Sequence, residues 1–305
     1  MSSPTQTQSG KAFEYILADN LAAFQDKPFT DGTAKEIARA AYFMHSAKEQ
    51  ESMKKAASEA VVFLCAHDVR FGRTMSVSLQ DDKEGKTGDV RDIVAHLDEG
   101  ETIGISAKNH HDAVKHSRLS DKIDFGKEWA DYPCSSAYMK RIKPVWNDLR
   151  QKRAEGVLFI DIPDKVNRYY LPVLTAFEDE LRSLCETYGK RFVMRLFQYL
   201  LGTKDFYKVI KENGHVAILS CNITGELIWG KKWKIPDRVE TIKRKSGSSS
   251  TILVTFEGGW QLSLRIHSAK KMTEPSLKFD IRFIGLPQSV ARHEIQIHQK
   301  PFGGV

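Results

Sequence analysis

The chain has 305 residues, of which 41% are hydrophobic and 28% are charged, and its formal net charge is +7. This length and apolar content suit one large or two small globular domains with a proper core, and they exclude a disordered chain. The basic excess is compatible with a nucleic-acid partner, although many ordinary soluble proteins share it.

The N-terminal ten residues are polar and lack the apolar segment of a signal peptide. No apolar run approaches the roughly 18 residues that a bilayer-spanning helix needs. The four cysteines are far apart and form no CxxC motif, which predicts free thiols in a reducing compartment and disfavours a zinc ribbon. We therefore expect a cytoplasmic protein with no membrane partner.

The first part of the chain predicts helices. Residues 10–23 place apolar side chains on one side of a helix that carries Glu14. A capping-box match at residues 33–36 begins a second helical pattern, which extends to residue 65 as two helices or one bent helix. Residues 75–79 then predict the first strand.

Residues 88–108, GDVRDIVAHLDEGETIGISAK, predict two apolar strands joined by an acidic turn that contains glycine. Asp92 begins the first strand and Lys108 ends the second, so an antiparallel hairpin places these two ends side by side. Ser106 and Lys108 share one face, because side chains alternate along a strand. A carboxylate beside an ammonium can hold a divalent metal and activate a water. The alternative is a surface hairpin with an ordinary Asp–Lys pair.

The next segment, residues 109–120, is rich in hydrogen-bond donors and predicts a polar loop or short helix. Such a segment can contact phosphates and base edges just downstream of the hairpin. Its candidate DNA-binding residues are Asn109, His110, His111, Lys115, His116 and Arg118.

A basic amphipathic helix is predicted at residues 137–153, with an interruption at Pro144. Its charged side is either solvated or in contact with the DNA backbone. Residues 171–188 and 191–201 predict two further helices, and Gly189 between them suits the end of the first.

From residue 215 the pattern changes to strands, with four β runs at residues 215–221, 251–256, 260–267 and 277–284. Arg265, His267 and Arg282 in these runs are candidate DNA contacts. The alternative for each of them is the polar face of a half-exposed sheet. We expect a helix-rich region with the candidate metal site in residues 1–205, and a β-rich region for DNA recognition in residues 206–305, which is either separate from the first region or continuous with it.

Five strings, in this order, resemble the HaeIII-type type II restriction endonucleases: GDVRDIV, IGISAKN, KHSRLS, DFGKEW and SLKFDIRFIGLP. The resemblance extends from about residue 10 to about residue 287. The hairpin also resembles the PD-(D/E)XK nuclease core, in which an Asp opens one strand and (D/E)-x-K closes the next. The resemblance implies an α+β or α/β fold, with a mixed sheet flanked by helices and a C-terminal antiparallel β-rich region. It makes the helix-rich residues 1–205 a nuclease core that carries the metal site. It further implies Mg²⁺-dependent hydrolysis of double-stranded DNA at GGCC.

The same resemblance implies site roles. Asp92 and the backbone carbonyl of Ala107 would bind Mg²⁺, and Lys108 would orient or deprotonate the attacking water or stabilise the charge at phosphorus. Ser106 stands where the superfamily has an acid, so either its hydroxyl or Glu14 would complete the metal site. Asp89 is an alternative to Asp92, but it precedes the predicted strand.

Two other functions stay open on the sequence. One is a catalytically silent DNA-binding protein of the same fold, which Ser106 favours. The other is a repair or recombination nuclease that selects DNA shape, although the extended C-terminal sheet favours a sequence reader. A palindromic target would suit a two-fold symmetric homodimer.

Overall fold

The computed structural model describes residues 4–80, 89–110 and 113–297, and it contains both helices and sheets. The chain divides into two compact units that are interleaved along the sequence. Unit 1 comprises Met1–Asp112, Gly202–Trp233 and Gln288–Val305, and unit 2 comprises Ala113–Leu201 and Lys234–Pro287.

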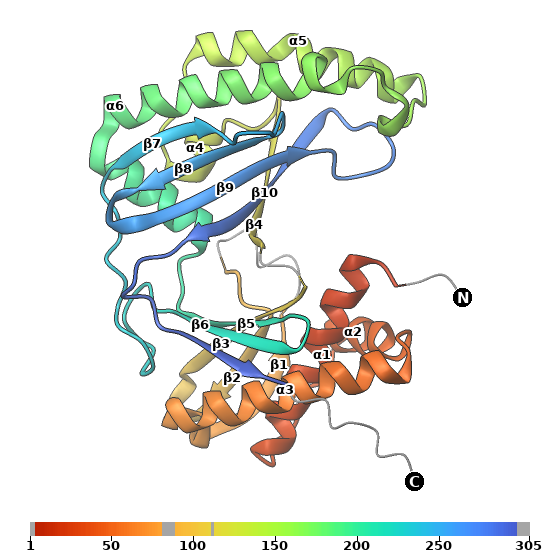
Figure 1. Ribbon diagram of the computed structural model, residues 1–305, viewed down its shortest axis with the longest axis vertical. Helices are drawn as coiled ribbons and strands as arrows, with labels where there is room; N and C mark the ends of the chain where they lie inside the picture. Colours follow the sequence, from red (N-terminus) through yellow and green to blue (C-terminus); the bar gives the residue numbers. More distant parts are fainter. Residues whose placement is uncertain (1–3, 81–88, 111–112, 298–305) are drawn as a thin grey trace. The chain divides into compact units, whose positions relative to one another are not determined.

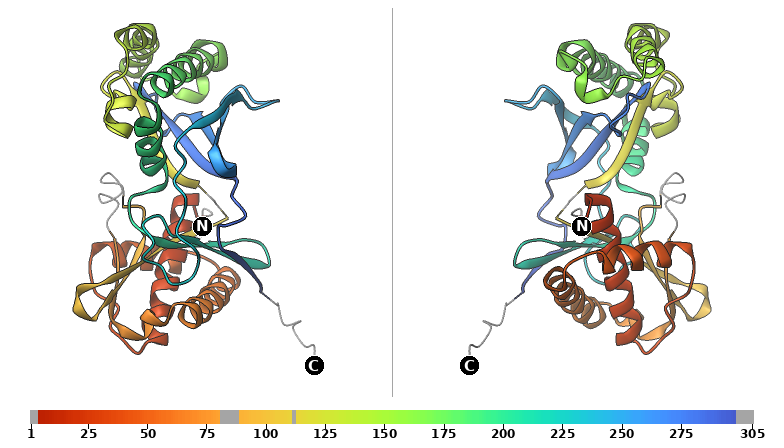
Figure 2. Two further views of the ribbon diagram at one scale, coloured as in Figure 1. Left: turned by 90° about the vertical axis from the view of Figure 1, so that its left-hand side faces the viewer. Right: turned by 90° about the vertical axis from the view of Figure 1, so that its right-hand side faces the viewer.

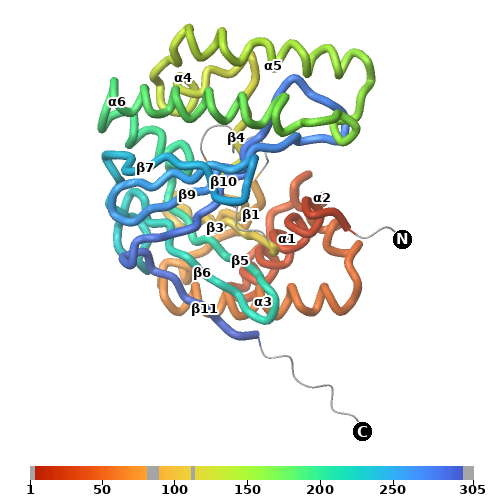
Figure 3. Tube along the Cα trace, turned by 45° about the horizontal axis from the view of Figure 1, so that its top comes forward, coloured from red at the N-terminus to blue at the C-terminus, as the bar shows by residue number. Residues whose placement is uncertain are grey.

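A six-stranded mixed sheet lies at the centre of unit 1, with the strand order β1-β2-β3-β5-β6-β11. β3 pairs antiparallel with β2 on one side and parallel with β5 on the other. Figure 3 shows that β11, from late in the chain, lies beside β6. The strands are β1 (Thr74–Leu79), β2 (Ile93–Leu97), β3 (Thr102–Asn109), β5 (Phe206–Lys211), β6 (His215–Cys221) and β11 (Arg292–Gln296).

Three helices accompany this sheet: α1 (Gln6–Phe24), α2 (Thr33–Phe43) and α3 (Ala47–His67). α1 packs against β3, and α3 packs against β5 and β6 (Figure 1). Phe13 of α1 and Ile105 of β3 are both fully buried in the shared core. Burial of each such side chain stabilises the fold by about 1.5–3 kcal/mol, so the packing of α1 on β3 is firmly specified.

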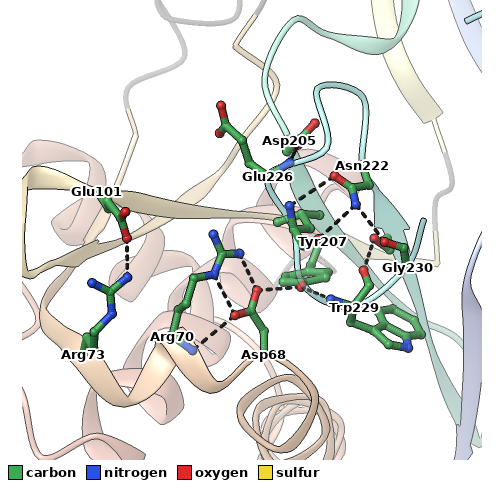
Figure 4. Close-up of polar contacts among 12 residues, drawn as sticks. Asp68, Arg70, Arg73, Glu101, Asp205, Tyr207, Asn222, Glu226, Trp229 and Gly230 are labelled. Atoms are coloured by element: carbon green, nitrogen blue, oxygen red, sulfur yellow. Dashed lines mark hydrogen bonds and ion pairs between the residues drawn. The ribbon is translucent and has the colours of Figure 1, made fainter. Parts of the chain in front are cut away.

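A buried polar network ties β5 to the end of α3 (Figure 4). Asp68 follows α3 and is fully buried, and it accepts hydrogen bonds from Arg70 and from the hydroxyl of Tyr207 on β5, the latter at 2.8 Å. Burial alone would raise the pKa of the Asp68 carboxyl, but these hydrogen bonds lower it below its usual value. The charged form is therefore kept inside the core, where it anchors the central strands.

Unit 2 contains a five-stranded antiparallel sheet with the order β4-β10-β9-β8-β7. Its helices lie on one side of the sheet (Figure 2). There Phe177 and Phe279 meet with ring centroids 5.0 Å apart, as do Phe197 and Trp260. The elements are β4 (Ala113–Ser120), β7 (Val239–Arg244), β8 (Thr251–Phe256), β9 (Trp260–His267), β10 (Ser276–Gly285), α4 (Phe125–Ala130), α5 (Ser136–Ala154) and α6 (Leu171–Leu201).

Several sequence predictions are confirmed. The hairpin of β2 and β3, the strand at residues 75–79 and the four later β runs are all present. The predicted break at Gly189 is a non-helical residue with a φ of 53° inside α6, a conformation that glycine adopts easily. No helix in the described ranges is both long and apolar enough to cross a membrane.

Other predictions are wrong. Residues 113–120 form strand β4 instead of a loop or helix, because they pair with β10. Pro144 does not interrupt α5. Gly32 occupies the N-cap of α2, and no side chain caps that helix, so the capping box at residues 33–36 is absent.

The division of the chain also differs from the expected boundary near residue 205. β5 and β6 follow that boundary, yet they pair with β3 and each other in the sheet of unit 1. β4 and the three helices α4, α5 and α6 precede the boundary, yet they belong to unit 2. Strand pairing between distant segments, which the order of the elements does not reveal, causes the difference.

Gly104 of β3 gives the first testable prediction. A Cβ added there would lie 1.9 Å from Cδ of Arg91, a buried side chain bound to Asp89. Gly104→Ala should lower the free energy of unfolding by about 1–3 kcal/mol, as overpacking of an interior does. Gly10→Ala is the control, because a Cβ at Gly10 in α1 meets no atom within 4 Å. Equal denaturation midpoints for the two variants would contradict the packing described here.

Candidate active site and nucleic-acid interface

The carboxylate of Asp92 is the centre of the candidate active site. Its backbone N–H donates to the carbonyl of Ile105, where the pairing of β2 with β3 ends. β3 continues beyond that point, and its next three residues all donate to Oδ2 of Asp92. The donors are Ser106 Oγ at 2.9 Å, the Ala107 N–H at 2.8 Å and Lys108 Nζ at 2.8 Å.

The other carboxylate oxygen of Asp92 accepts no hydrogen bond from the described residues. The Asp92 side chain is 19% exposed, so this oxygen is open to a ligand. The N–H and C=O of one strand residue point to the same side. Because the N–H of Ala107 points toward Asp92, its carbonyl lies on that side too. The Asp92 carboxylate and the backbone carbonyl of Ala107 therefore lie on the same side of β3.

α1 places a second carboxylate near this site. Glu14 is 7% exposed, and Lys11 Nζ lies 3.0 Å from its Oε2. Burial and the negative charge of Asp92 raise the pKa of Glu14 to about 7, while Lys11 and Lys108 act in the opposite direction. Glu14 is therefore close enough to Asp92 for the two charges to repel, and a divalent cation would relieve that repulsion.

Lys108 is held mainly by Asp92. Burial alone would lower its pKa, but the charge of Asp92, their hydrogen bond and the charge of Glu14 raise the pKa above the usual value for lysine. The ammonium form is thus favoured in this arrangement. Lys11 was not identified from the sequence, although its spacing of three residues from Glu14 on a helix is a usable signal.

Asp89 has a different environment. Both of its oxygens are bound by Arg91, through Nε at 2.8 Å and Nη2 at 2.6 Å, and Lys204 Nζ lies 3.3 Å away. Burial opposes ionisation, but hydrogen bonds from Arg91 and Gln80 hold the pKa of Asp89 at about 2. Asp89 is therefore one half of a buried ion pair, which supports Asp92 as the metal ligand of the two.

The candidate donors at the end of β3 and directly after it are only partly available. Asn109 is 4% exposed, and its amide donates to the carbonyl of Ser9, so it ties β3 to α1. His110 lies 3.3 Å from Lys211 Nζ beside a cavity of about 800 Å³, and burial and the charge of Lys211 lower its pKa. His111 lies outside the described residues.

The sheet of unit 2 brings the other candidates together on one face, opposite the helices. Asp280 of β10 is paired with His116 of β4 and Arg265 of β9. Two residues earlier, Lys278 is paired with Arg118 and His267 in the same way, and Arg282 follows two residues after Asp280 on the same face. Lys278 and Asp280 were missed, although the alternation of residues 278, 280 and 282 marks one face of a strand.

Lys115 is separated from this group. Its ammonium donates to the carbonyl of Tyr199 in α6 at 2.8 Å and lies 3.7 Å from the centre of the Tyr199 ring. Burial lowers the pKa of Lys115 to about 8. Lys115 thus stabilises the contact between β4 and α6 on the covered face of the sheet.

Metal binding at the candidate active site would depend on few protein ligands. In the described ranges, no group of three His, Cys, Asp or Glu side chains is arranged to hold a metal ion. The donors at Asp92 are two carboxylates and a backbone carbonyl, all of them hard oxygens. Mg²⁺ suits such a set, because it commonly takes one or two carboxylates and keeps several waters.

Comparisons with known proteins identify the family of the chain. Residues 10–287 match the HaeIII restriction endonuclease family. The type II restriction enzyme HaeIII of Haemophilus aegyptius is 30% identical, and the match covers 92% of this chain and 95% of that enzyme. No solved structure matches the chain. The protein is thus a type II site-specific deoxyribonuclease. Within that class, it belongs to the HaeIII restriction endonuclease family.

The two aspartates should respond differently to substitution. Asp89→Asn should lower the free energy of unfolding by about 3–5 kcal/mol, because it leaves the buried Arg91 charge without its partner. Asp92→Asn should change the free energy of unfolding by about 1 kcal/mol or less, since removal of the Asp92 charge also relieves its repulsion with Glu14. Urea denaturation of both variants tests this, and a larger loss for Asp92→Asn would reverse the two assignments.

Proposed function

We propose that this restriction endonuclease has a PD-(D/E)XK-type core and hydrolyses DNA with Mg²⁺ at Asp92. The supporting observation is the convergence of Ser106, Ala107 and Lys108 on one oxygen of Asp92, which leaves the other oxygen open. β2 and β3, the two strands of the proposed nuclease core that hold these residues, both belong to the mixed sheet of unit 1.

Asp92, the carbonyl of Ala107 and Glu14 are the residues that would hold the ion. When bound, Mg²⁺ supplies charge neutralisation at phosphorus and lowers the pKa of a bound water. Ser106 donates to Asp92, so its role here is to fix the carboxylate. Lys108 would orient the attacking water or stabilise the charge that develops on the phosphate oxygens. Glu14 would supply the acidic charge that Ser106 lacks.

The substrate is double-stranded DNA, and we propose the target GGCC, as the family resemblance implies. A palindromic site would be met by a two-fold symmetric pair of copies. The exposed cationic face of the unit 2 sheet would contact the DNA through His116, Arg118, Arg265, His267 and Arg282. The four free cysteines suit the reducing cytoplasm that we propose as the location.

The catalytically silent DNA-binding protein that the sequence left open disagrees with the membership of this chain in a family of restriction endonucleases. Incubation of the protein with plasmid DNA and Mg²⁺, followed by mapping of the fragment ends, therefore tests the proposed cofactor and target. Fragments with common ends in GGCC support both. Intact plasmid under conditions where the protein binds duplex DNA would contradict the proposed use of Mg²⁺ at Asp92.

Asp92→Ala should abolish cleavage, because it removes a metal ligand and the acceptor that organises Lys108. Binding of a GGCC duplex in a gel-shift assay without Mg²⁺ should stay within a few-fold of wild type, since Asp92 contacts no base in this proposal. The matched variant Asp98→Ala removes a surface carboxylate from the turn of the same hairpin and should still cleave. Cleavage by Asp92→Ala at the wild-type rate would rule out the assigned site.

Glu14→Gln should raise the Mg²⁺ concentration needed for half-maximal cleavage, because the isosteric amide removes one negative charge from the site. Ser106→Ala should have a smaller effect, since it removes one of three hydrogen bonds to Asp92 and no charge. Ser106→Asp restores the superfamily pattern and should partly rescue Glu14→Gln. The measurement is cleavage of a short GGCC duplex across a Mg²⁺ titration, and a wild-type titration curve for Glu14→Gln would show that Glu14 is an ordinary helix charge.

A further inference from the structure

The exposed face of the unit 2 sheet has a carboxylate among its cations. Asp280 is 4% exposed, whereas its neighbours across the strands, His116 and Arg265, have side chains that are 42% and 52% exposed. Asp280 therefore lies at the base of the face, and the two basic side chains extend above it toward solvent.

Each oxygen of Asp280 has its own partner. Oδ1 lies 2.8 Å from Nδ1 of His116, and Oδ2 accepts from Nη2 of Arg265 at 2.7 Å. Nε2 of His267 lies 3.4 Å from Oδ1. These neighbours outweigh burial and hold the pKa of Asp280 well below its usual range. The carboxylate stays charged, so it can fix the position of the Arg265 guanidinium.

The position of this carboxylate argues against a surface made only for phosphates. A negative charge among Arg265, His116 and Lys278 weakens the attraction for the DNA backbone, which depends on net positive charge. Its contribution is instead directional, because a charge-assisted hydrogen bond to a buried carboxylate restricts the rotamers of a long side chain. Restricted orientation matters for base recognition, where donors must match acceptors on one base edge.

Arg265 retains donors for such recognition. A guanidinium carries five N–H groups in a fixed plane, and the bond to Asp280 uses one of them. The remaining donors can form two parallel hydrogen bonds with O6 and N7 of guanine, the most common specific contact of arginine in the major groove. Lysine in the same place would provide charge without this planar pair of donors.

We propose that Asp280 is a positioning residue that fixes Arg265 for the recognition of a guanine in the target site. This inference rests on the proposed function, in which this face contacts double-stranded DNA. Asp280 itself touches no base in the proposal. It acts through the orientation of Arg265 and, secondarily, of His116.

The test first requires the cleavage site of the wild-type enzyme, mapped from the ends of plasmid fragments. Dissociation constants are then measured without Mg²⁺ for a duplex with the mapped site, for duplexes with one guanine replaced, and for an unrelated duplex. Asp280→Asn and Arg265→Lys should each weaken binding to the mapped site roughly 10- to 100-fold, as the loss of one bidentate base contact does. Binding to the unrelated duplex should be unchanged or stronger.

Two comparisons separate positioning from a general structural role. Asp179→Asn removes a carboxylate that pairs with Arg141 on the helices of the same unit, and it should leave the ratio of specific to non-specific binding unchanged. In the double variant of Asp280→Asn with Arg265→Lys, the loss should be close to that of Arg265→Lys alone, because both changes remove one contact. If Asp280→Asn does not fold, Asp280→Glu takes its place, because it keeps the charge but moves the carboxylate by one methylene and should show the same loss of discrimination.

The outcomes are distinct. If the wild-type enzyme has no fixed cleavage sequence, the proposed function fails before any variant is compared, and the inference fails with it. If the wild-type site is fixed but a folded Asp280→Asn and Arg265→Lys discriminate as well as wild type, the positioning role alone is overturned. Equal losses on the specific and unrelated duplexes would also overturn it, because they would show a phosphate contact.

Discussion

The hydrogen bonds accepted by Asp92 depend on one constraint, the different lengths of two paired strands. β2 stops pairing at Ile93, and β3 runs on to Asn109 along β5. The backbone N–H of Ala107 on β3 therefore has no partner on β2, and it lies where Asp92, the residue before β2, places its carboxylate. Asp92 accepts hydrogen bonds from Ser106, Ala107 and Lys108, so these donors and the carboxylate all have partners.

The same site depends on a neighbouring structural pair. Asp89 is only three residues from Asp92, but its oxygens are bound by Arg91, whose aliphatic part lies over Gly104 of β3. The Arg91 guanidinium occupies both oxygens of Asp89, whereas one oxygen of Asp92 can still accept a ligand. The two neighbouring acids thus have separate roles. The buried pair fixes the chain just before the candidate catalytic carboxylate.

Local sequence patterns were sufficient for part of this structure. The alternation of residues 102–108 predicted β3 and the pairing of Asp92 with Lys108, since both follow from the geometry of one hairpin. β5 was missed, because it is buried on both faces and carries Lys208 on one face and Lys211 on the other, which an alternating apolar pattern does not allow for. The covered position of Lys115 depends on α6, and the position of Asp280 depends on β4 and β9, so neither could be derived from its own segment.

The interleaved path of the chain has a consequence for folding. The hairpin with Asp92 and Lys108 is local, but its parallel partner begins at Phe206, after the whole Ala113–Leu201 segment of unit 2. Closing so long a loop costs conformational entropy before the β3–β5 contacts can offset that cost. This pairing is therefore expected to form late in folding. During synthesis, the ribosome makes the hairpin of β2 and β3, which carries the candidate active site, long before it makes β5. A nascent chain would therefore pair β3 with β5 beside the candidate active site only after about two thirds of the chain has been made.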